Sequence, residues 1–166
     1  MPDAPAELEQ LLATLAAAGV EFILVGGAAA LIQGAPITTQ DLDIVHRRDP
    51  DNVARLLATL EQLDASMLDL ARRKLPPTAE GLRGRGQTLM NTKLGRLDAL
   101  GSLHDGRGYE ELIEHTDIVD LDGAELRVLD LETLIEIKSS TGRAKDRLVV
   151  PILLELARVR AEQDDR

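Results

Sequence analysis

The stretch from Phe22 to His46, FILVGGAAALIQGAPITTQDLDIVH, indicates the fold more clearly than any other part of the sequence. Residues 22–25 are apolar and end at two glycines, which is typical of a short buried strand. Gly26 and Gly27 can adopt backbone angles that other residues avoid, and they leave room for another group to approach the main chain. Residues 28–33 predict a short helix, whose first backbone amides favour an anion such as a phosphate.

The end of the same stretch predicts a second strand over residues 41–45, DLDIV. Side chains alternate along a strand, so Asp41 and Asp43 point to one face while Leu42 and Ile44 point into the core. Two carboxylates on one face are suitable ligands for a divalent cation. A phosphate-binding turn beside such a pair points to nucleotide chemistry.

A third carboxylate comes from Asp98 in the stretch LGRLDAL (residues 94–100), where it lies inside the predicted strand 96–100. An acid at the centre of a strand is disfavoured unless it faces solvent or a site. Asp98 either pairs with Arg96 on the same face or joins Asp41 and Asp43. In the second case, three carboxylates on adjacent strands can hold two Mg²⁺ ions for the transfer of a phosphoryl-linked group.

The pattern along the chain predicts a mixed α/β or α+β fold in one domain, with helices packed mainly on one face of the sheet. Residues 71–86 predict an irregular, mobile loop, and a helix over 52–63 is expected to be capped by Asp51. The remaining predicted elements are helices over 4–19, 109–114, 130–140 (capped by Asp130) and 146–161 (kinked or started by Pro151), and strands over 88–93, 96–100, 116–121 and 125–128.

These motifs resemble those of the nucleotidyltransferase superfamily whose core is similar to DNA polymerase β, and especially of its small, minimal bacterial members. The superfamily pattern is a Gly-Gly or Gly-Ser turn after the first strand, a short helix, Asp-x-Asp on the next strand, and a later Asp. The resemblance covers most of the chain, from about residue 20 to 160. The matching residues are Gly26-Gly27, Gly34-x-Pro36, Thr39, Asp41-Leu42-Asp43, Asp98, Leu131 to Lys138 (LETLIEIK), and Gly142-Arg143-x-Lys145-Asp146.

The resemblance implies transfer of a nucleoside monophosphate from an NTP such as ATP, with two Mg²⁺ ions, to a hydroxyl or phosphate. Gly26 and Gly27 would hold the β- and γ-phosphates. Asp41 and Asp43 would bind both metal ions. Asp98 would bind one ion and help to deprotonate the acceptor.

Three further residues are assigned to the nucleotide only through the resemblance. Thr39 precedes the acidic pair, and Lys138 and Lys145 would either reach the triphosphate or fix the last helices, over about 130–161, against the core. From its position alone, Lys138 is expected to be solvated or to pair with a neighbour such as Glu136. His46, at the end of the acidic strand, is expected to be a surface residue.

The sequence departs from the superfamily pattern at two positions. Gly27 stands where many active members have Ser, and Ile37 stands where relatives often have Arg near the nucleotide. From the pattern along the chain we also expect no additional domain that holds an acceptor. The acceptor is therefore left open among a tRNA, a protein and a small molecule, and a partner subunit, as in a toxin–antitoxin pair, would supply the missing surface.

Charge is unevenly distributed along the chain. The formal net charge is −10, which argues against non-specific nucleic-acid binding by the whole surface. Basic residues nevertheless crowd two segments, 72–85 and 138–147. Each segment either serves a polyphosphate or a nucleic-acid acceptor locally or is solvated surface.

Composition and spacing exclude several other classes. With no cysteine the chain has neither disulfides nor thiolate metal sites. No apolar run has membrane-spanning length and no export signal is present, so we expect a cytoplasmic protein without membrane contact. The glycine spacing does not fit a dinucleotide-binding turn, and two acids on one strand face cannot flank a glycosidic bond.

Two functions from different classes therefore remain open. One is a nucleotidyltransferase that uses Asp41, Asp43 and Asp98. The other is a non-catalytic protein of the same fold that binds a partner or a nucleotide as a regulator. Convergence of the three carboxylates would favour the enzyme, whereas a salt bridge filling that space would favour the regulator.

Overall fold

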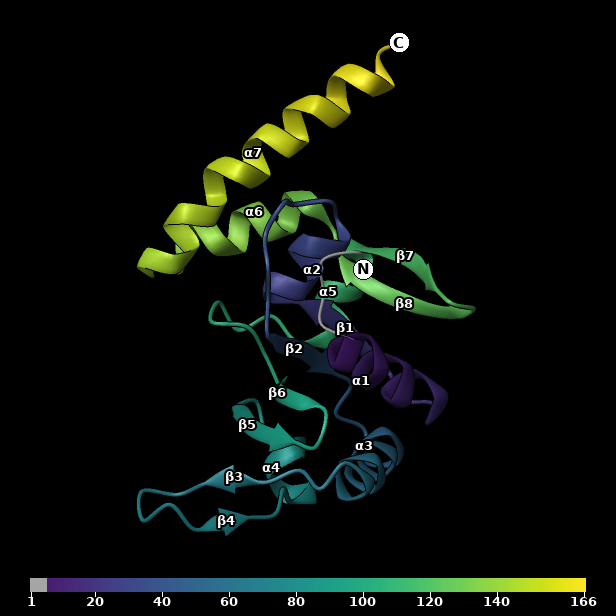
Figure 1. The fold of residues 1–166 in the computed structure, drawn as a ribbon, viewed down its shortest axis with the longest axis vertical. Helices are drawn as coiled ribbons and strands as arrows, with labels where there is room; N and C mark the ends of the chain where they lie inside the picture. The colour runs from purple at the N-terminus through teal and green to yellow at the C-terminus, as the bar shows by residue number, and fades with distance from the viewer. Residues whose placement is uncertain (1–5) are drawn as a thin grey trace.

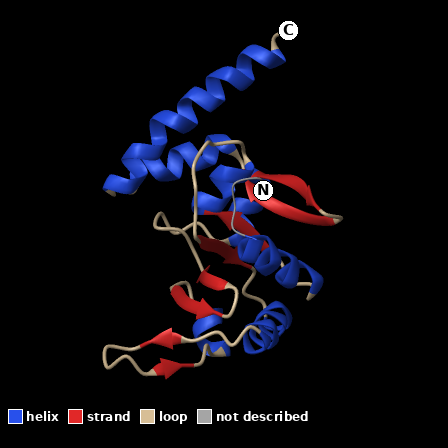
Figure 2. Cartoon of the chain, viewed as in Figure 1, coloured by secondary structure: helices blue, strands red, loops and turns tan. Residues whose placement is uncertain are grey.

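A computed structural model describes residues 6–166 and shows a six-stranded mixed sheet surrounded by helices (Figures 1 and 2). The strand order is β5-β6-β2-β1-β8-β7. Strand β1 is antiparallel to β2 and parallel to β8, and β2 is parallel to β6. The strands are β1 (Phe22–Val25), β2 (Asp41–His46), β5 (Gln87–Thr92), β6 (Gly95–Leu100), β7 (Thr116–Leu121) and β8 (Ala124–Leu129).

The helices follow the apolar periodicity of the sequence. Their bounds are α1 (Ala6–Ala17), α2 (Gly26–Ile32), α3 (Pro50–Gln62), α4 (Ala79–Arg83), α5 (Tyr109–Leu112), the 3₁₀ turn η1 (Ile113–His115), α6 (Leu131–Ser140) and α7 (Ala144–Asp164). The first two residues of the predicted helix 4–19 lie outside the described residues. Within residues 6–166 no helix combines the length and the apolar character needed to cross a membrane.

The core forms where alternation along the central strands buries one face. Leu42, Ile44, Leu97 and Ala99 are completely buried, as predicted for the residues that alternate with the acids. The leucines of α1, at positions 8, 11, 12 and 15, belong to the same cluster. The core is aliphatic, and its two aromatic side chains, Phe22 and Tyr109, are also buried. Burial of one face leaves the acids on the other face of the sheet, which holds the candidate site.

The structure corrects two predictions of local structure. Residues 71–86 are not irregular, because they contain the strand β4 (Lys74–Leu75), paired with β3 (Met67–Leu68), and the helix α4. Helix α3 is capped by Asp49, whose side chain accepts a hydrogen bond from the Asn52 amide, and Pro50 is its first residue. This order is the ordinary one, since proline fits the first turn of a helix.

Two further corrections concern single residues. His46 is buried rather than on the surface, and its Nε2 lies 2.6 Å from the backbone oxygen of Leu82 in α4. Burial lowers the pKa of the His46 imidazole. Helix α7 begins well before Pro151 and continues through it, so Pro151 does not mark its start, and the alternative of a kink stays a prediction. The predicted N-cap of α6 is confirmed, because Asp130 accepts a hydrogen bond from the Thr133 amide at 2.8 Å.

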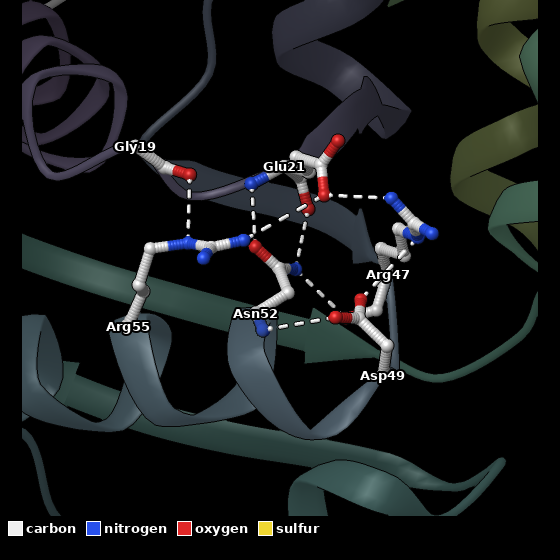
Figure 3. Close-up of polar contacts among 6 residues, drawn as sticks. All are labelled: Gly19, Glu21, Arg47, Asp49, Asn52 and Arg55. Atoms are coloured by element: carbon white, nitrogen blue, oxygen red, sulfur yellow. Dashed lines mark hydrogen bonds and ion pairs between the residues drawn. The ribbon is translucent and has the colours of Figure 1, made fainter.

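A buried asparagine ties α3 to the beginning of β1 and the end of β2 (Figure 3). The side chain of Asn52 accepts a hydrogen bond from the Glu21 amide at 2.7 Å and donates to the carbonyl oxygens of Glu21 and Arg47 at 2.9 and 2.7 Å. Ion pairs of Arg47 with Glu21 and Asp49 surround it. This network fixes the ends of β1 and β2 that lie away from the candidate site.

We expect Asn52→Ala to lower the free energy of unfolding by about 3 kcal/mol, because the Glu21 amide and the Arg47 carbonyl lose their side-chain partner, while the Glu21 carbonyl keeps its hydrogen bond from the Arg47 amide. The matched control is Asn91→Ala, since Asn91 is exposed on β5. Chemical denaturation of both variants tests this. A loss for Asn52→Ala no larger than that of the control would contradict it.

Candidate functional site

The register of the sheet places two of the predicted carboxylates side by side. Asp43 of β2 is the direct partner of Asp98 on β6 and of Val25 on β1. Asp41 is the partner of Arg96, one row nearer the start of the two strands. Residues paired in this way point to the same face. The three acids predicted from sequence therefore share one face, at the end of β1 that leads into Gly26.

Asp43 is the electrostatic centre of this group. Burial, the negative charge of Asp98, a hydrogen bond with the Asp98 carboxyl and the charge of Asp41 together raise the pKa of Asp43 to about 6. The positive charge of Lys138 acts in the opposite direction. Two carboxyl groups this close cannot both ionise at low cost unless a cation neutralises them.

Asp98 also forms the ion pair that was the alternative interpretation of its sequence. Its Oδ1 lies 3.2 Å from Nε of Arg96, and its side chain is 14% exposed, compared with 47% for Arg96. Asp98 therefore contacts both Asp43 and Arg96. The pair with Arg96 sits at the solvent edge of the site, where an ion pair contributes little to stability.

Gly26 is required by the close approach of the Asp43 carboxylate to the main chain. Its φ is +67°, in the left-handed region, and a Cβ placed on it would lie 2.4 Å from Oδ2 of Asp43. Helix α2 begins at this residue. The turn that was singled out in the sequence is thus built to bring backbone next to the acid.

Gly27 meets Thr39 in a similar way. A Cβ on Gly27 would lie 3.0 Å from Oγ1 of Thr39, which itself donates a hydrogen bond to the backbone oxygen of Asp41 at 3.1 Å. Thr39 thus places a hydroxyl beside Gly27, at the position where the superfamily pattern often has a serine.

A buried ion pair and the exposed side chain of Arg143 close the site from the side of α6 and α7. Nζ of Lys138 lies 3.2 Å from Oδ1 of Asp146, and the two side chains are 11% and 7% exposed. Thr141 and Arg143 bond to the other carboxylate oxygen of Asp146, at 2.6 and 3.1 Å. Burial raises the pKa of Asp146, but the hydrogen bond from Thr141 and the contacts with Lys138 outweigh it and the pKa is lowered.

This group corrects the position-based expectation for Lys138, which is neither solvated nor paired with Glu136. Asp146 was named only as part of a matching motif and was given no role. Its signal in the sequence is its place between Lys145 and Arg147, in the first turn of a helix. The pair of Lys138 with Asp146 joins α6 to α7, a contact that neither alternative for this lysine predicted.

Two adjoining cavities meet at these residues. The first, of about 160 Å³, lies against Gly26 and Gly27, and the second, of about 80 Å³, lies between α6 and the segment after β6. Both are lined by Gly26, Asp43, Lys138, Arg143 and Asp146. The first is also lined by Ile37, Thr38, Thr39, Asp41, Lys145 and Val149. It therefore collects all but one of the residues assigned to the nucleotide and the metal, the exception being Asp98 on the neighbouring strand.

The donor set fits a divalent cation in its chemistry. Within residues 6–166 no group of three or more His, Cys, Asp or Glu side chains is already closed around a metal position. The neighbouring carboxyls of Asp43 and Asp98 nevertheless repel each other, and hard carboxylate oxygens are the ligands that Mg²⁺ prefers. A bound cation would take the place of the proton that the raised pKa of Asp43 retains.

Comparison with known proteins adds evidence on the fold. No protein-family model matches the sequence, and no curated protein sequence matches it. Among solved structures, the lincosamide antibiotic adenylyltransferase LnuA with lincomycin bound is similar at a TM-score of 0.62 and 13% identity, over 93% of this chain and 99% of that one. The chain has the nucleotidyltransferase fold.

Two other structures of this fold support the assignment. ANT(2″)-Ia in complex with adenylyl-2″-tobramycin matches at a TM-score of 0.53 and 14% identity, over 96% of this chain and 95% of that one. A putative nucleotidyltransferase from Thermotoga maritima, TM1012, matches at a TM-score of 0.51 and 15% identity, over 96% of this chain and 91% of that one. The α+β fold class and the resemblance inferred from sequence are confirmed. Identities this low show the nucleotidyltransferase fold alone, and the site residues stay predictions.

The raised pKa of Asp43 predicts that the site destabilises the protein above neutral pH. A carboxyl whose pKa rises from 3.8 to about 6 on folding contributes stability that is full below pH 3.8 and lost as the pH rises through about 6. Asp43→Asn should therefore raise the free energy of unfolding by about 3 kcal/mol at about pH 8 in EDTA, and by much less at about pH 4.5.

Thermal unfolding at the two pH values measures this difference, with Asp165→Asn at the exposed C-terminus as the matched control. The stabilisation corresponds to a rise in Tm of roughly 6–12 °C for a chain of this size. An equal rise in Tm at both pH values would show that folding does not raise the pKa of Asp43.

Proposed function

We propose that the protein is a nucleotidyltransferase that moves a nucleoside monophosphate from an NTP to an acceptor. One observation carries this proposal: the Asp43 and Asp98 carboxyl pair lies directly beside a cavity that is lined by Lys138, Arg143 and Lys145. A triphosphate needs cationic neighbours, and the transfer of its α-phosphoryl group needs negative ligands for metal ions at the same place.

The triphosphate is assigned to the first cavity. Backbone amides of Gly26 and Gly27 and the hydroxyl of Thr39 face a phosphate there, and Lys145 and Arg143 neutralise it. The absence of a side chain at Gly26 is what allows Asp43 and the phosphates to approach the same stretch of main chain. Lys138 either stays with Asp146 or turns to the phosphates when the nucleotide enters.

Asp41, Asp43 and Asp98 would hold two Mg²⁺ ions, which when bound activate the attacking oxygen and stabilise the leaving pyrophosphate. The protein itself orients the nucleotide, excludes water through the buried contacts of α6 with α7, and accepts a proton. The position of Asp98, on the outer side of Asp43 and next to the exposed Arg96, supports a role for Asp98 toward the acceptor.

A non-catalytic nucleotide- or partner-binding protein of the same fold is the second candidate, and one observation favours it. The ion pair of Asp98 with Arg96 engages one of the three carboxylates that the reaction needs. In that case the NTP binds without turnover. A toxin–antitoxin role, a partner subunit and a tRNA, protein or small-molecule acceptor belong to the first candidate as predicted from the resemblance.

Calorimetric titration with ATP, CTP, GTP and UTP in the presence of Mg²⁺ tests the proposal. We expect metal-dependent binding of at least one NTP, weakened more than about tenfold in Asp41→Asn/Asp43→Asn, because the ligands of the metal–triphosphate complex are neutralised. The control Asp164→Asn/Asp165→Asn removes the same charge at the end of α7. Loss of binding in both double variants, or binding of no NTP by the wild type, would contradict it.

Gly26→Ala provides a second test because Gly123 is a matched control. Both glycines have positive φ, +67° and +89°, so alanine strains the backbone by a similar amount, about 1 kcal/mol, at each. Only at position 26 does the new Cβ meet the Asp43 carboxylate, whereas no atom lies within 4 Å at position 123. Calorimetry should show NTP affinity lost in Gly26→Ala and kept in Gly123→Ala. Equal affinities would remove Gly26 from the phosphate site.

A further inference from the structure

The basic residues of segment 65–96 are not explained by the nucleotide site. This segment contains seven basic and two acidic residues, whereas the other 134 residues contain 12 basic and 27 acidic residues. It comprises β3, β4, α4, β5 and the start of β6. A protein with a net charge of −10 therefore gathers positive charge in one continuous part of the chain. Such asymmetry indicates a polyanionic partner.

The hairpin of β3 and β4 projects from the sheet at the end of the molecule opposite the C-terminus of α7 (Figure 1). Asp69 organises its turn by accepting hydrogen bonds from the amides of Ala71 and Arg73 and by pairing with the Arg73 guanidinium at 2.7 Å. Arg72 and Lys74 are exposed and form no ion pair among the described residues 6–166. Their charges are thus available to a ligand.

The register connects this hairpin to the carboxylates. Asp41 is the partner of Arg96, Arg96 is the partner of Asn91, and Asn91 bridges to Ser66, which directly precedes β3. Adjacent strands are about 4.8 Å apart, so the hairpin leaves the sheet roughly 14 Å from Asp41 along one row. Lys74, the partner of Leu68, and Arg72 in the turn lie beyond this point, so a ligand that joins them to the carboxylates must extend over several nucleotides.

The face between the two is open. Gln87, Leu89 and Asn91 of β5 share the face of Asp98, as their pairing with β6 requires, and all three are exposed. Leu89, the direct partner of Asp98, is 44% exposed and offers apolar surface beside the carboxylate. An acceptor can approach along this face while the nucleotide occupies the cavity on the other side of Asp43.

We propose that the acceptor is a single-stranded nucleic acid whose backbone follows Arg72, Lys74 and Arg96 and whose terminal hydroxyl reaches Asp98. This inference rests on the proposed function for its chemistry. The hydroxyl oxygen forms a bond to the α-phosphorus, the bond from that phosphorus to the β-phosphate oxygen breaks, pyrophosphate leaves, and the proton passes to a carboxylate of the site. Every nucleic acid supplies both the repeated negative charge and a terminal hydroxyl. An acidic protein supplies the negative charge but need not present a hydroxyl at the end of the charged stretch.

The manner of binding follows from the composition. Both aromatic residues, Phe22 and Tyr109, are buried, so bases have no ring on which to stack. Binding is then carried by phosphate contacts, with little preference for sequence and a strong dependence on salt.

Fluorescence anisotropy with a labelled RNA of about 15 nucleotides, without NTP, tests the surface between about 50 and 300 mM KCl. Arg72→Gln/Lys74→Gln should lower the slope of log K against log salt by about 1.4 and weaken binding roughly tenfold at 100 mM, because two phosphate contacts are lost. Arg158→Gln/Arg166→Gln removes the same charge from α7 and the C-terminus and should behave as wild type.

Three outcomes would overturn the proposal: no RNA binding by the wild type at the lowest salt, equal losses in the two double variants, or displacement of RNA by polyglutamate as effectively as by unlabelled RNA. A DNA strand of the same sequence distinguishes the two nucleic acids. NTP titration of Arg72→Gln/Lys74→Gln separates the surface from the proposed function, since its NTP affinity should equal that of the wild type. If the wild type binds RNA through the hairpin but binds no NTP, the proposed function is contradicted and the nucleic-acid-binding surface is retained.

Discussion

The repulsion between the carboxyls of Asp43 and Asp98 is the constraint around which the site is arranged. Parallel pairing of β2 with β6 places the two acids side by side, and burial of the alternate residues prevents either from turning away. Each neighbour limits the resulting cost. Gly26 gives the Asp43 carboxylate room against the main chain, Arg96 pairs with Asp98, and the charge of Lys138 opposes the rise in the pKa of Asp43. An arrangement that destabilises the empty site favours the binding of a cation there.

A strained site of this kind needs a rigid frame, and two buried amide side chains provide it. Asn52 fixes the ends of β1 and β2 away from the site. Gln33, which follows α2, donates to Asp117 of β7 at 2.9 Å and to the backbone oxygen of Leu129 of β8 at 3.1 Å, and it also accepts from Arg160 of α7. The helix after the glycine turn is thereby held to the far edge of the sheet and to the last helix. Neither amide lies in a recognisable motif.

Sequence reasoning succeeded where a local pattern determines the structure. Alternation around Asp41 and Asp43 and the glycine turn suffice to give strand, turn, helix and strand. It failed where the partner is distant in sequence. The burial of His46 depends on Leu82, and the pair of Lys138 with Asp146 depends on the packing of α6 on α7, which no spacing reveals. The segment 71–86 was misjudged because its glycines and prolines suggest a loop, whereas pairing of β3 with β4 and a short helix order it.

The basic residues on the two sides of Asp43 differ in their surroundings. On one flank of Asp43 the basic residues are buried or line a cavity, so they suit a compact anion that is enclosed on binding. On the other flank they are exposed on an open sheet face and a projecting hairpin, so they suit an extended anion that lies across the surface. The acids between them keep the two anions apart until a cation is present. In the proposed reaction a donor and an acceptor that are both negative would meet at the carboxylates, because acidic residues outnumber basic ones in the rest of the chain.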